Sequence, residues 1–214
     1  MRDLIIICED SFGLDVLEIA EASLAYYKIH YPGLVFNIKG FLCPVQIKDQ
    51  LDFSPYPYLG TADEWLPLPD ERFAMGILDP YHKKQIAEMM KSKGGKFMIL
   101  WAPWVLAPIT MQFGEGSIIA AQSIKMGAEI GAFTTLFHCM VGDAKIGDYC
   151  SVMAWSNVTD VSLGQMSYVS DNVAIMMDLS VGENVCICPN SIVVKNLKAN
   201  TKVSGIPARK VREK

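Results

Sequence analysis

Aliphatic residues recur at a fixed interval through the second half of the chain. From residue 146 to residue 193 the interval is six residues, except for one step of five. The aliphatic positions are Ile146, Val152, Val158, Leu163, Val169, Ile175, Val181, Ile187 and Val193. A helix repeats its apolar face about every 3.6 residues and a half-buried strand every 2, so neither element explains this interval. A period of six is typical of a β-helix, in which each aliphatic side chain points inward and stacks on its counterpart in the next coil.

Glycine directly follows the aliphatic residue of every third hexad. The pairs are Ile130-Gly131, Ile146-Gly147, Leu163-Gly164 and Val181-Gly182, and Phe113-Gly114 extends the series. Three hexads make one triangular coil of about 18 residues, and glycine suits a corner that needs unusual backbone angles. We therefore predict a β-helix over residues 110–214. Residues 193–212 leave the register and are predicted to fold over the last coil as a cap.

The first half of the chain has a different pattern, in which short apolar runs alternate with helical spacing. The predicted strands are Leu4–Cys8, Val35–Leu42, Phe73–Leu78 and Lys96–Trp101, and the predicted helices are Leu14–Tyr27 and Pro80–Lys93. Gly94-Gly95 is expected to end the second helix, and the Pro-, Tyr- and Gly-rich residues 52–69 are expected to form a loop. This alternation predicts an α/β domain over residues 1–105, built on a small parallel sheet.

Composition and charge narrow the class of protein. The chain has 214 residues and a formal net charge of -4, which gives no reason to expect nucleic acid binding. No apolar run approaches the roughly 20 residues of a membrane span, and the apolar run Leu4–Cys8 is too short for a secretory signal. We therefore expect a cytoplasmic protein. Cations gather near the C-terminus, either as a solvated tail or as a site for a phosphorylated ligand. They are Lys195, Lys198, Lys202, Arg209, Lys210, Arg212 and Lys214.

The cysteines and histidines do not have the spacing of a metal site. The six cysteines contain no C-x-x-C pair, and the three histidines (30, 82 and 138) share no ligand spacing with them. We interpret the cysteines as reduced, mostly buried apolar residues, and no metal is expected.

Three segments carry a resemblance to a known family. They are Val203–Lys210 (VSGIPARK), the last-coil stretch 181–196, and residues 59–66 (LGTADEWL). With the hexad repeat, they make the chain similar to the hexapeptide-repeat acyltransferases, in particular the sialic-acid O-acetyltransferase and the acetyltransferases that act on amino-sugar nucleotides. The resemblance covers the whole chain. It implies a Rossmann-like N-terminal domain, a left-handed β-helix, a homotrimer, and acetyl-CoA as co-substrate.

The glycine-rich loop of that family is altered in this chain. The family places G-x-G-G-x-G-R-E after the first strand, where bare backbone approaches phosphates. The corresponding stretch here is Cys8–Asp15, which keeps only Gly13 and adds the carboxylates of Glu9 and Asp10. These charges would repel a pyrophosphate unless a metal intervened. The residues predicted to contact the acceptor are Ser11, Gly13 and Gly76.

The histidine that serves the family as general base is also displaced. Its motif position falls at Gly142-Asp143, so the acidic neighbour is present and the histidine is not. The coil from Ile130 to Ile146 is 16 residues long, and His138 lies within it. The resemblance suggests that His138 acts as base, with Asp143 orienting the imidazole if the two meet. Otherwise His138 is a structural or surface residue and Asp143 a polar corner residue.

The resemblance also implies a groove for acetyl-CoA along the β-helix. By family position, the cofactor contacts are Ser151, Asp171, Cys188, Lys195, Arg209 and Lys210. Lysine and arginine suit the phosphates because they form charge-assisted hydrogen bonds. Trp155, Met166, Met177 and Pro189 stand where smaller residues are usual, so they either narrow this groove or face solvent or a partner subunit.

Two functions from different classes follow. The first is direct acetyl transfer from acetyl-CoA to a sugar, amino sugar or sugar nucleotide, with a histidine as base and without a covalent enzyme intermediate. The second is a catalytically silent relative that binds a ligand or acts as a structural or regulatory trimer. The altered loop and the displaced histidine are what the second predicts. A third interpretation is an active enzyme with another acceptor, because the altered loop would release the need for a nucleotide.

Overall fold

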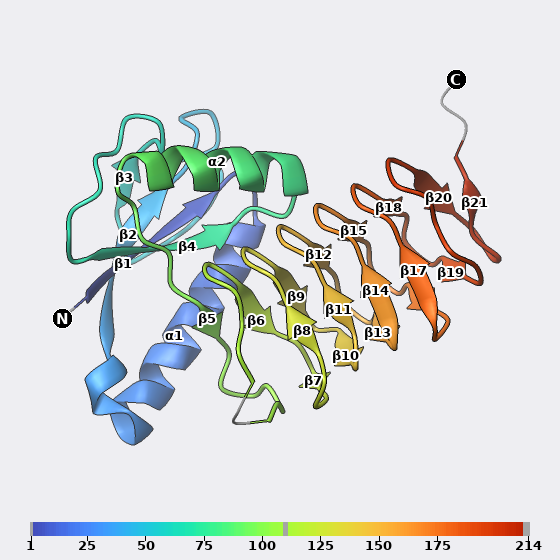
Figure 1. The fold of residues 1–214 in the computed structure, drawn as a ribbon. Helices are drawn as coiled ribbons and strands as arrows, with labels where there is room; N and C mark the ends of the chain where they lie inside the picture. Colours follow the sequence, from blue (N-terminus) through green and yellow to red (C-terminus); the bar gives the residue numbers. More distant parts are fainter. Residues whose placement is uncertain (1, 109–110, 212–214) are drawn as a thin grey trace.

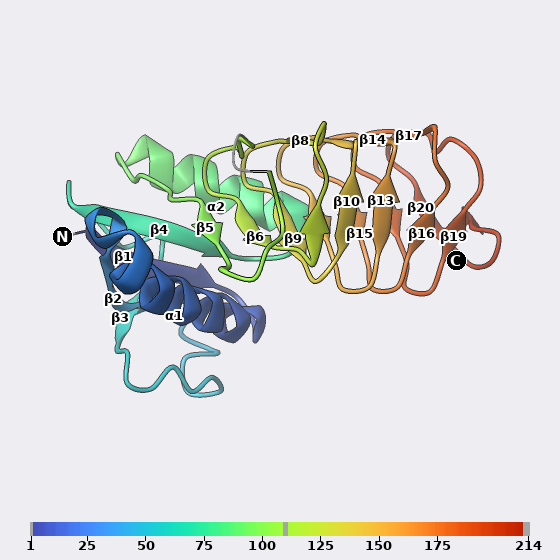
Figure 2. The same ribbon diagram turned by 90° about the horizontal axis from the view of Figure 1, so that it is seen from below.

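The computed structural model describes residues 2–108 and 111–211, which form an α/β unit followed by a long β-helix (Figure 1). The coils of the β-helix stack in a row away from the α/β unit, and the C-terminal strands lie at the far end (Figures 1 and 2). No helix in the described part of the chain is long and apolar enough to cross a membrane.

The α/β unit is built on a four-stranded parallel sheet with the order β3-β2-β1-β4. The strands are β1 (Arg2–Cys8), β2 (Phe36–Leu42), β3 (Tyr58–Gly60) and β4 (Glu71–Gly76). The helices are α1 (Phe12–His30) and α2 (Pro80–Ser92), with the short 3-10 helix η1 (Pro32–Leu34) after α1.

Strand β1 shows how the sheet separates the two helices. Leu4 and Ile6 belong to the core that also contains α1, whereas Ile5 and Ile7 belong to the core under α2. Successive side chains of a strand point to opposite faces, so a continuous apolar run is what a strand with a helix on each face requires. The predicted run Leu4–Cys8 is confirmed in this role.

Two predictions for the α/β unit were wrong. Residues 52–69 contain β3, which the Pro and Gly content of this stretch did not indicate. Residues 96–101 do not form a fourth strand of this sheet: Phe97 makes a single bridge to Phe73, and the next residues turn into the β-helix. There β5 (Leu100–Trp101) pairs with β6 (Ile118–Ala120).

The β-helix has three faces. The eight-strand face consists of β5, β6, β9 (Thr135–Phe137), β12 (Ser151–Val152), β15 (Tyr168–Val169), β18 (Cys186–Ile187), β20 (Lys202–Ser204) and β21 (Arg209–Lys210). The five-strand face consists of β7 (Ser123–Ile124), β10 (Met140–Gly142), β13 (Asn157–Thr159), β16 (Ala174–Ile175) and β19 (Ile192–Val193). The four-strand face consists of β8 (Glu129–Ile130), β11 (Lys145–Ile146), β14 (Val161–Leu163) and β17 (Leu179–Val181).

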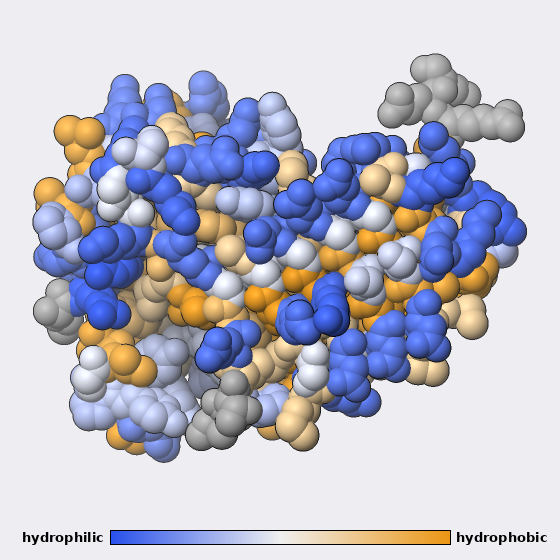
Figure 3. All heavy atoms as spheres, viewed as in Figure 1, coloured by the Kyte–Doolittle hydropathy of each residue, from blue (hydrophilic) through white to orange (hydrophobic). Residues whose placement is uncertain are grey.

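The predicted six-residue period is confirmed as the core of the β-helix. All nine aliphatic residues from Ile146 to Val193 are exposed by 5% or less. The glycine of each third hexad lies where coils touch: a Cβ on Gly147 would come within 2.6 Å of the Gln165 backbone nitrogen. Figure 3 shows the outer surface as an apolar and neutral band along the β-helix between hydrophilic rims.

The chain's last described segment keeps more of the register than predicted. Strand β20 pairs in parallel with β18, so it adds a further rung to the eight-strand face. Strand β21 then reverses direction and pairs with β20. A closing segment that covers the last coil is therefore present, but it begins after β20. Arg212 and Lys214 lie outside the described residues.

Candidate functional site

The α/β unit packs on the eight-strand face of the β-helix. One outward row of that face runs Thr135, Ser151, Tyr168, Cys186, Lys202, as the strand register shows. Helix α2 covers the first two members, which are fully buried, whereas Tyr168 and Cys186 are half-buried and Lys202 is exposed. Thr135 and Ser151 therefore lie at the junction of the two units. Tyr168, Cys186 and Lys202 continue the row as an open surface beyond the start of α2.

A buried lysine holds α2 on the β-helix. Lys83 has no exposed surface, and its Nζ donates to Thr135 Oγ1 at 2.9 Å, to Ser151 Oγ at 2.7 Å and to the Cys150 carbonyl at 3.1 Å. Ser151 Oγ in turn donates to the Leu78 carbonyl at 2.7 Å. Loss of hydration lowers the pKa of the Lys83 ammonium to about 7, although the nearby Cys150 and Asp79 act in the opposite direction.

A pocket of about 420 Å³ lies where the row emerges from α2. One wall comes from Asp10 and the helix start at Asp79–Tyr81, and the other from Tyr168 and Cys186. Burial raises the pKa of the Tyr168 phenol, and the charges of Asp171, Cys186, Asp10 and Asp79 add to this increase. This pocket thus combines an aromatic floor, a thiol and carboxylates.

A second pocket, of about 470 Å³, lies at the carboxyl edge of the parallel sheet. Its polar lining includes Glu9, Gln46, Thr61, Asp63 and Glu64. Ligands commonly bind at this edge in open α/β sheets. Its acidic lining agrees with the expectation that a pyrophosphate would be repelled here.

The two glycines predicted to contact an acceptor meet behind this edge. A Cβ on Gly76 would lie 2.9 Å from the Ile7 carbonyl oxygen and 3.3 Å from the Gly13 Cα. A Cβ on Gly13 would lie 2.5 Å from the Cys8 Cβ. Close packing of α1 on β1 and β4 therefore explains both glycines without a ligand. Ser11 is exposed at the start of α1, and its side chain makes no capping hydrogen bond there.

A histidine and a carboxylate pair at the same edge. His82, in the first turn of α2, lies with its Nδ1 3.2 Å from Glu9 Oε2, just after β1. The two side chains are 57% and 31% exposed, so the ring remains accessible from solvent. Asp79 fixes the helix start, because its Oδ1 accepts hydrogen bonds from the backbone nitrogens of Tyr81 and His82 at 3.0 and 2.9 Å.

His138 lies at the corner between the eight-strand and five-strand faces. It has a φ of 47°, and its ring is nearly parallel to that of Trp104, with centroids 6.4 Å apart. Its ring makes no hydrogen bond within the described residues. A nearby carboxyl belongs to Asp15 of α1, whose pKa is raised by burial and by Glu18 and lowered by the charge of His138.

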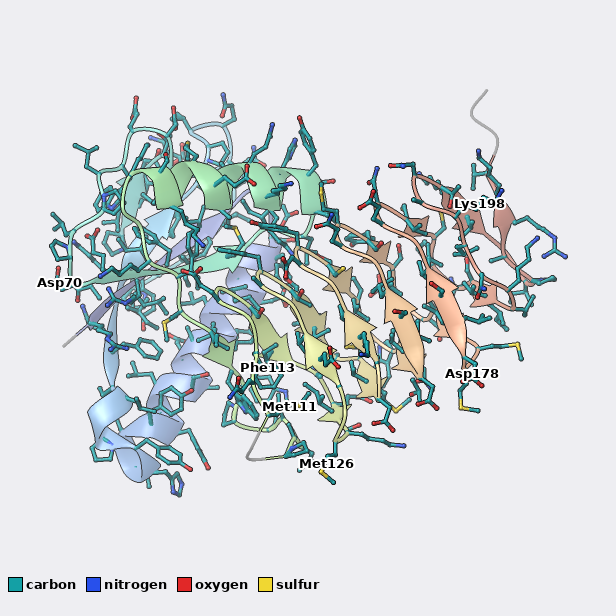
Figure 4. The ribbon with its side chains drawn as sticks, in the orientation of Figure 1. Asp70, Met111, Phe113, Met126, Asp178 and Lys198 are labelled. Atoms are coloured by element: carbon teal, nitrogen blue, oxygen red, sulfur yellow. The ribbon has the colours of Figure 1, made fainter. Side chains whose placement is uncertain are left out.

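Asp143 lies at a different corner, between the five-strand and four-strand faces. It is exposed, has a φ of 46°, and shares a groove with Asp160 and Asp178. Figure 4 shows Asp178 projecting outward at this corner. The structure therefore does not bring Asp143 and His138 together within one chain, because strand β10 separates the two corners.

The predicted cofactor residues occupy varied surroundings. Ser151 is fully buried under α2, so its position does not support contact with a cofactor. Cys188 is half-buried, two residues after Cys186 on the eight-strand face, and Asp171 is exposed at a corner. Arg209 and Lys210 are exposed on β21, at the end of the same face, and Lys195 is exposed after β19.

Sequence reasoning missed the pairing of His82 with Glu9. The two residues are 73 positions apart, and only the sheet brings them together. A signal was nevertheless present, since each follows a predicted buried strand, and the carboxyl ends of parallel strands share one edge. Asp79-Pro80 also indicated that His82 falls in the first turn of a helix.

Comparisons with known proteins support the fold. No protein-family model matches the sequence, and no curated protein matches it. A mutant of perosamine N-acetyltransferase from Caulobacter crescentus, solved in complex with CoA and GDP-perosamine, has a TM-score of 0.83 at 17% identity, covering 100% of this chain and 98% of that chain. The acetyltransferase domain of PglB from Neisseria gonorrhoeae FA1090 has a TM-score of 0.72 at 17% identity, covering 99% and 100%. WeeI from Acinetobacter baumannii AYE has a TM-score of 0.55 at 16% identity, covering 99% and 100%.

These likenesses show that the chain shares the fold of sugar acetyltransferases along its whole length. The parallel β-helix matches the left-handed β-helix of such proteins. The expected β-helix is therefore confirmed, and a parallel sheet with helices precedes it.

Proposed function

We propose that this protein transfers an acetyl group from acetyl-CoA to an amino sugar or sugar nucleotide. The observation that carries the proposal is the match over both units, and not over the β-helix alone, to an enzyme solved with CoA and GDP-perosamine. The α/β unit and the β-helix of this chain meet in the same arrangement, with one pocket at the carboxyl edge of the sheet and another at the start of α2.

The eight-strand face has the features that a CoA thioester needs. Its open row leads from the pocket floored by Tyr168 and Cys186 to Lys202 and the exposed cations Arg209 and Lys210. Such a path offers an apolar and aromatic floor for a pantetheine chain and positive charge for phosphates. Neither Trp155 nor Met177 lines this pocket, whereas Met166 does.

The finer description follows from the same proposal. We assign residues 1–105 to a Rossmann-like domain and residues 110–214 to a left-handed β-helix, although the strand pairing of the second begins at Leu100. Homotrimer formation and a cytoplasmic location stay predictions. His138 and Asp143 stay a predicted catalytic pair only if a neighbouring subunit brings the two corners together.

The test is calorimetric titration with acetyl-CoA, followed by assays of thiol release with a panel of GDP- and UDP-linked 4-amino sugars, beginning with GDP-perosamine. We expect micromolar dissociation of acetyl-CoA, the usual range for substrates, and acceptor-dependent release of CoA. Charge reversal at the far end of the face (R209E/K210E) should weaken binding at least tenfold while leaving the unfolding temperature within a few degrees.

The second candidate function is a catalytically silent relative. The acidic carboxyl edge and the burial of Ser151 favour it, because both remove features expected of the family site. If acetyl-CoA does not bind, or binds without turnover on any acceptor of the panel, the silent relative replaces the enzyme.

A further inference from the structure

We propose that His82, oriented by Glu9, is the residue that accepts the proton of the acceptor during acetyl transfer. The inference rests on the proposed function and assigns its base to the carboxyl edge of the α/β sheet. The family motif position, which here holds Gly142-Asp143, has no part in it.

The first argument is the geometry of the pair. A general base needs one ring nitrogen held by an acceptor and the other free to face the substrate. Glu9 holds Nδ1 of His82 at 3.2 Å, so Nε2 is the free nitrogen. A carboxylate in this place fixes the orientation of the ring and stabilises the imidazolium that forms on proton transfer.

The second argument is that the backbone under the ring is fixed from two directions. Asp79 accepts hydrogen bonds from the first backbone nitrogens of α2, including that of His82 itself. The next residue, Lys83, is anchored by three oxygen atoms of the β-helix at 2.7 to 3.1 Å. The backbone of this turn is therefore fixed, so the His82 side chain is held in place although it is exposed to solvent.

The third argument is the place of the pair between the two pockets. Glu9 lines the pocket at the sheet edge, and Tyr81, adjacent to His82, lines the pocket at the eight-strand face. His82 itself lines neither pocket, so the proposal requires that an acceptor held at the edge and a thioester held on the face meet beside it. No other histidine in residues 2–108 and 111–211 pairs with a carboxylate: the ring of His138 faces Trp104, and that of His30 packs on Tyr26.

The proton and electron changes balance on this arrangement. The lone pair of the neutral acceptor amine attacks the thioester carbonyl carbon, and an amine N–H proton passes to Nε2 of His82. The C–S bond breaks, and its electron pair leaves with the sulfur of CoA. The imidazolium then returns the proton to that thiolate, so acetyl-CoA and amine become amide and CoA thiol.

The experiment compares four single variants of the full-length protein: H82Q, E9Q, H138N and H30Q. Asparagine is chosen at position 138 because that residue has a positive φ, which asparagine tolerates. The same sugar-nucleotide panel supplies the acceptor, and acetyl-CoA affinity is measured for each variant by calorimetry. We expect H82Q to lower kcat by roughly 100-fold or more and E9Q by about tenfold or more, with acetyl-CoA affinity unchanged. H30Q is the control and should stay within about threefold of the wild type, whereas H138N tests the rival base.

A second readout separates catalysis from folding. The H82G variant should regain turnover when free imidazole is added, because the exposed position admits the small base; E9Q should not respond. Full activity in H82Q together with its loss in H138N would overturn the assignment and leave the proposed function intact. Wild-type protein that neither binds acetyl-CoA nor acetylates any member of the panel would overturn the proposed function, and this assignment with it.

Discussion

The two histidine regions of the molecule differ in how the fold places a side chain. At the carboxyl edge, His82 meets Glu9 across 73 residues of sequence. The helix that carries His82 is fixed by hydrogen bonds that Asp79 accepts from its backbone and that Lys83 donates to the β-helix. At the corner of the β-helix, His138 occupies a position set by the repeat. The following coils place Trp155, Asn172 and Asn190 at the same corner, each also with positive φ.

The comparison shows that the repeat of the β-helix fixes where a corner residue lies but not which side chain it meets. The α/β unit, which has no repeat, brings two particular side chains together. Each corner of the β-helix accepts almost any side chain that tolerates its backbone angles, because its contacts are mainly backbone hydrogen bonds to adjacent coils. His138 donates its backbone N–H to the Ala120 carbonyl, and its own carbonyl accepts from Trp155. Among the described residues, the imidazole forms no ion pair, although the carboxyl of Asp15 lies nearby. The edge instead brings together residues of distant segments, as His82 and Glu9 show.

The largest effect is expected from removing the anchor of the edge. K83A should lower the free energy of unfolding by about 3 kcal/mol, because it leaves a cavity and two buried hydroxyl groups without their donor. Chemical denaturation at pH 7 measures this change. If K83A is neutral and also leaves turnover unchanged, the edge does not depend on its junction with the β-helix.

The same lysine gives the stability a pH dependence. Its pKa is about 7 in the folded protein and about 10.5 ordinarily, so between these values the unfolded chain holds more protons. The free energy of unfolding should therefore rise as the pH increases from about 7 toward 10.5, and the gain is absent below pH 7. K83M, which keeps the length of the side chain, should flatten this rise relative to the wild type.

An intermediate effect is expected from the close packing behind the edge. G13A should cost about 2 kcal/mol, because the added Cβ would overlap Cys8, and overpacking of this kind typically costs 1–3 kcal/mol. Gly33 has no atom within 4 Å of its Cβ position, so G33A is the matched control and should change stability little. Thermal unfolding of the two variants compares them directly. Equal effects would show that the edge has room to relax and is not rigid.

The smallest effect on stability is expected at the corner of the β-helix that holds His138 and Trp155. Here the substitution should raise the free energy of unfolding, whereas the substitutions above should lower it. Trp155 is 70% exposed and has a φ of 62°, an unfavourable backbone conformation for a bulky residue. W155N should raise the free energy of unfolding by about 1 kcal/mol, since asparagine occupies the equivalent position in the next two coils. Turnover should not change. A loss of acetylation in W155N would show that the corner takes part in ligand binding, and the contrast between the two regions would fail.

The periodic part of the fold was predictable because burial repeats in it. The burial of each aliphatic residue from Ile146 to Val193 could be predicted from its place in the six-residue repeat alone, and each of these residues is buried. Strand β3 and the switch of residues 96–101 into the β-helix could not be predicted, because both depend on which sheet edge is free to pair. The same limit applies to the candidate site. The charge of Glu9 was visible, but its partner His82 was fixed by the order β2-β1-β4, which no local pattern encodes.

The short reach of α2 along the eight-strand face has a consequence for how such a protein can change over generations. Helix α2 covers only Thr135 and Ser151 of the outward row on this face. An insertion of one whole coil beyond β18 would therefore leave the contacts at the edge unchanged. It would move the terminal cations outward by one strand spacing, about 4.8 Å. The number of coils thus sets the distance between the pocket beside α2 and the terminal cations, and it can be lengthened or shortened in whole steps without rebuilding the rest of the molecule.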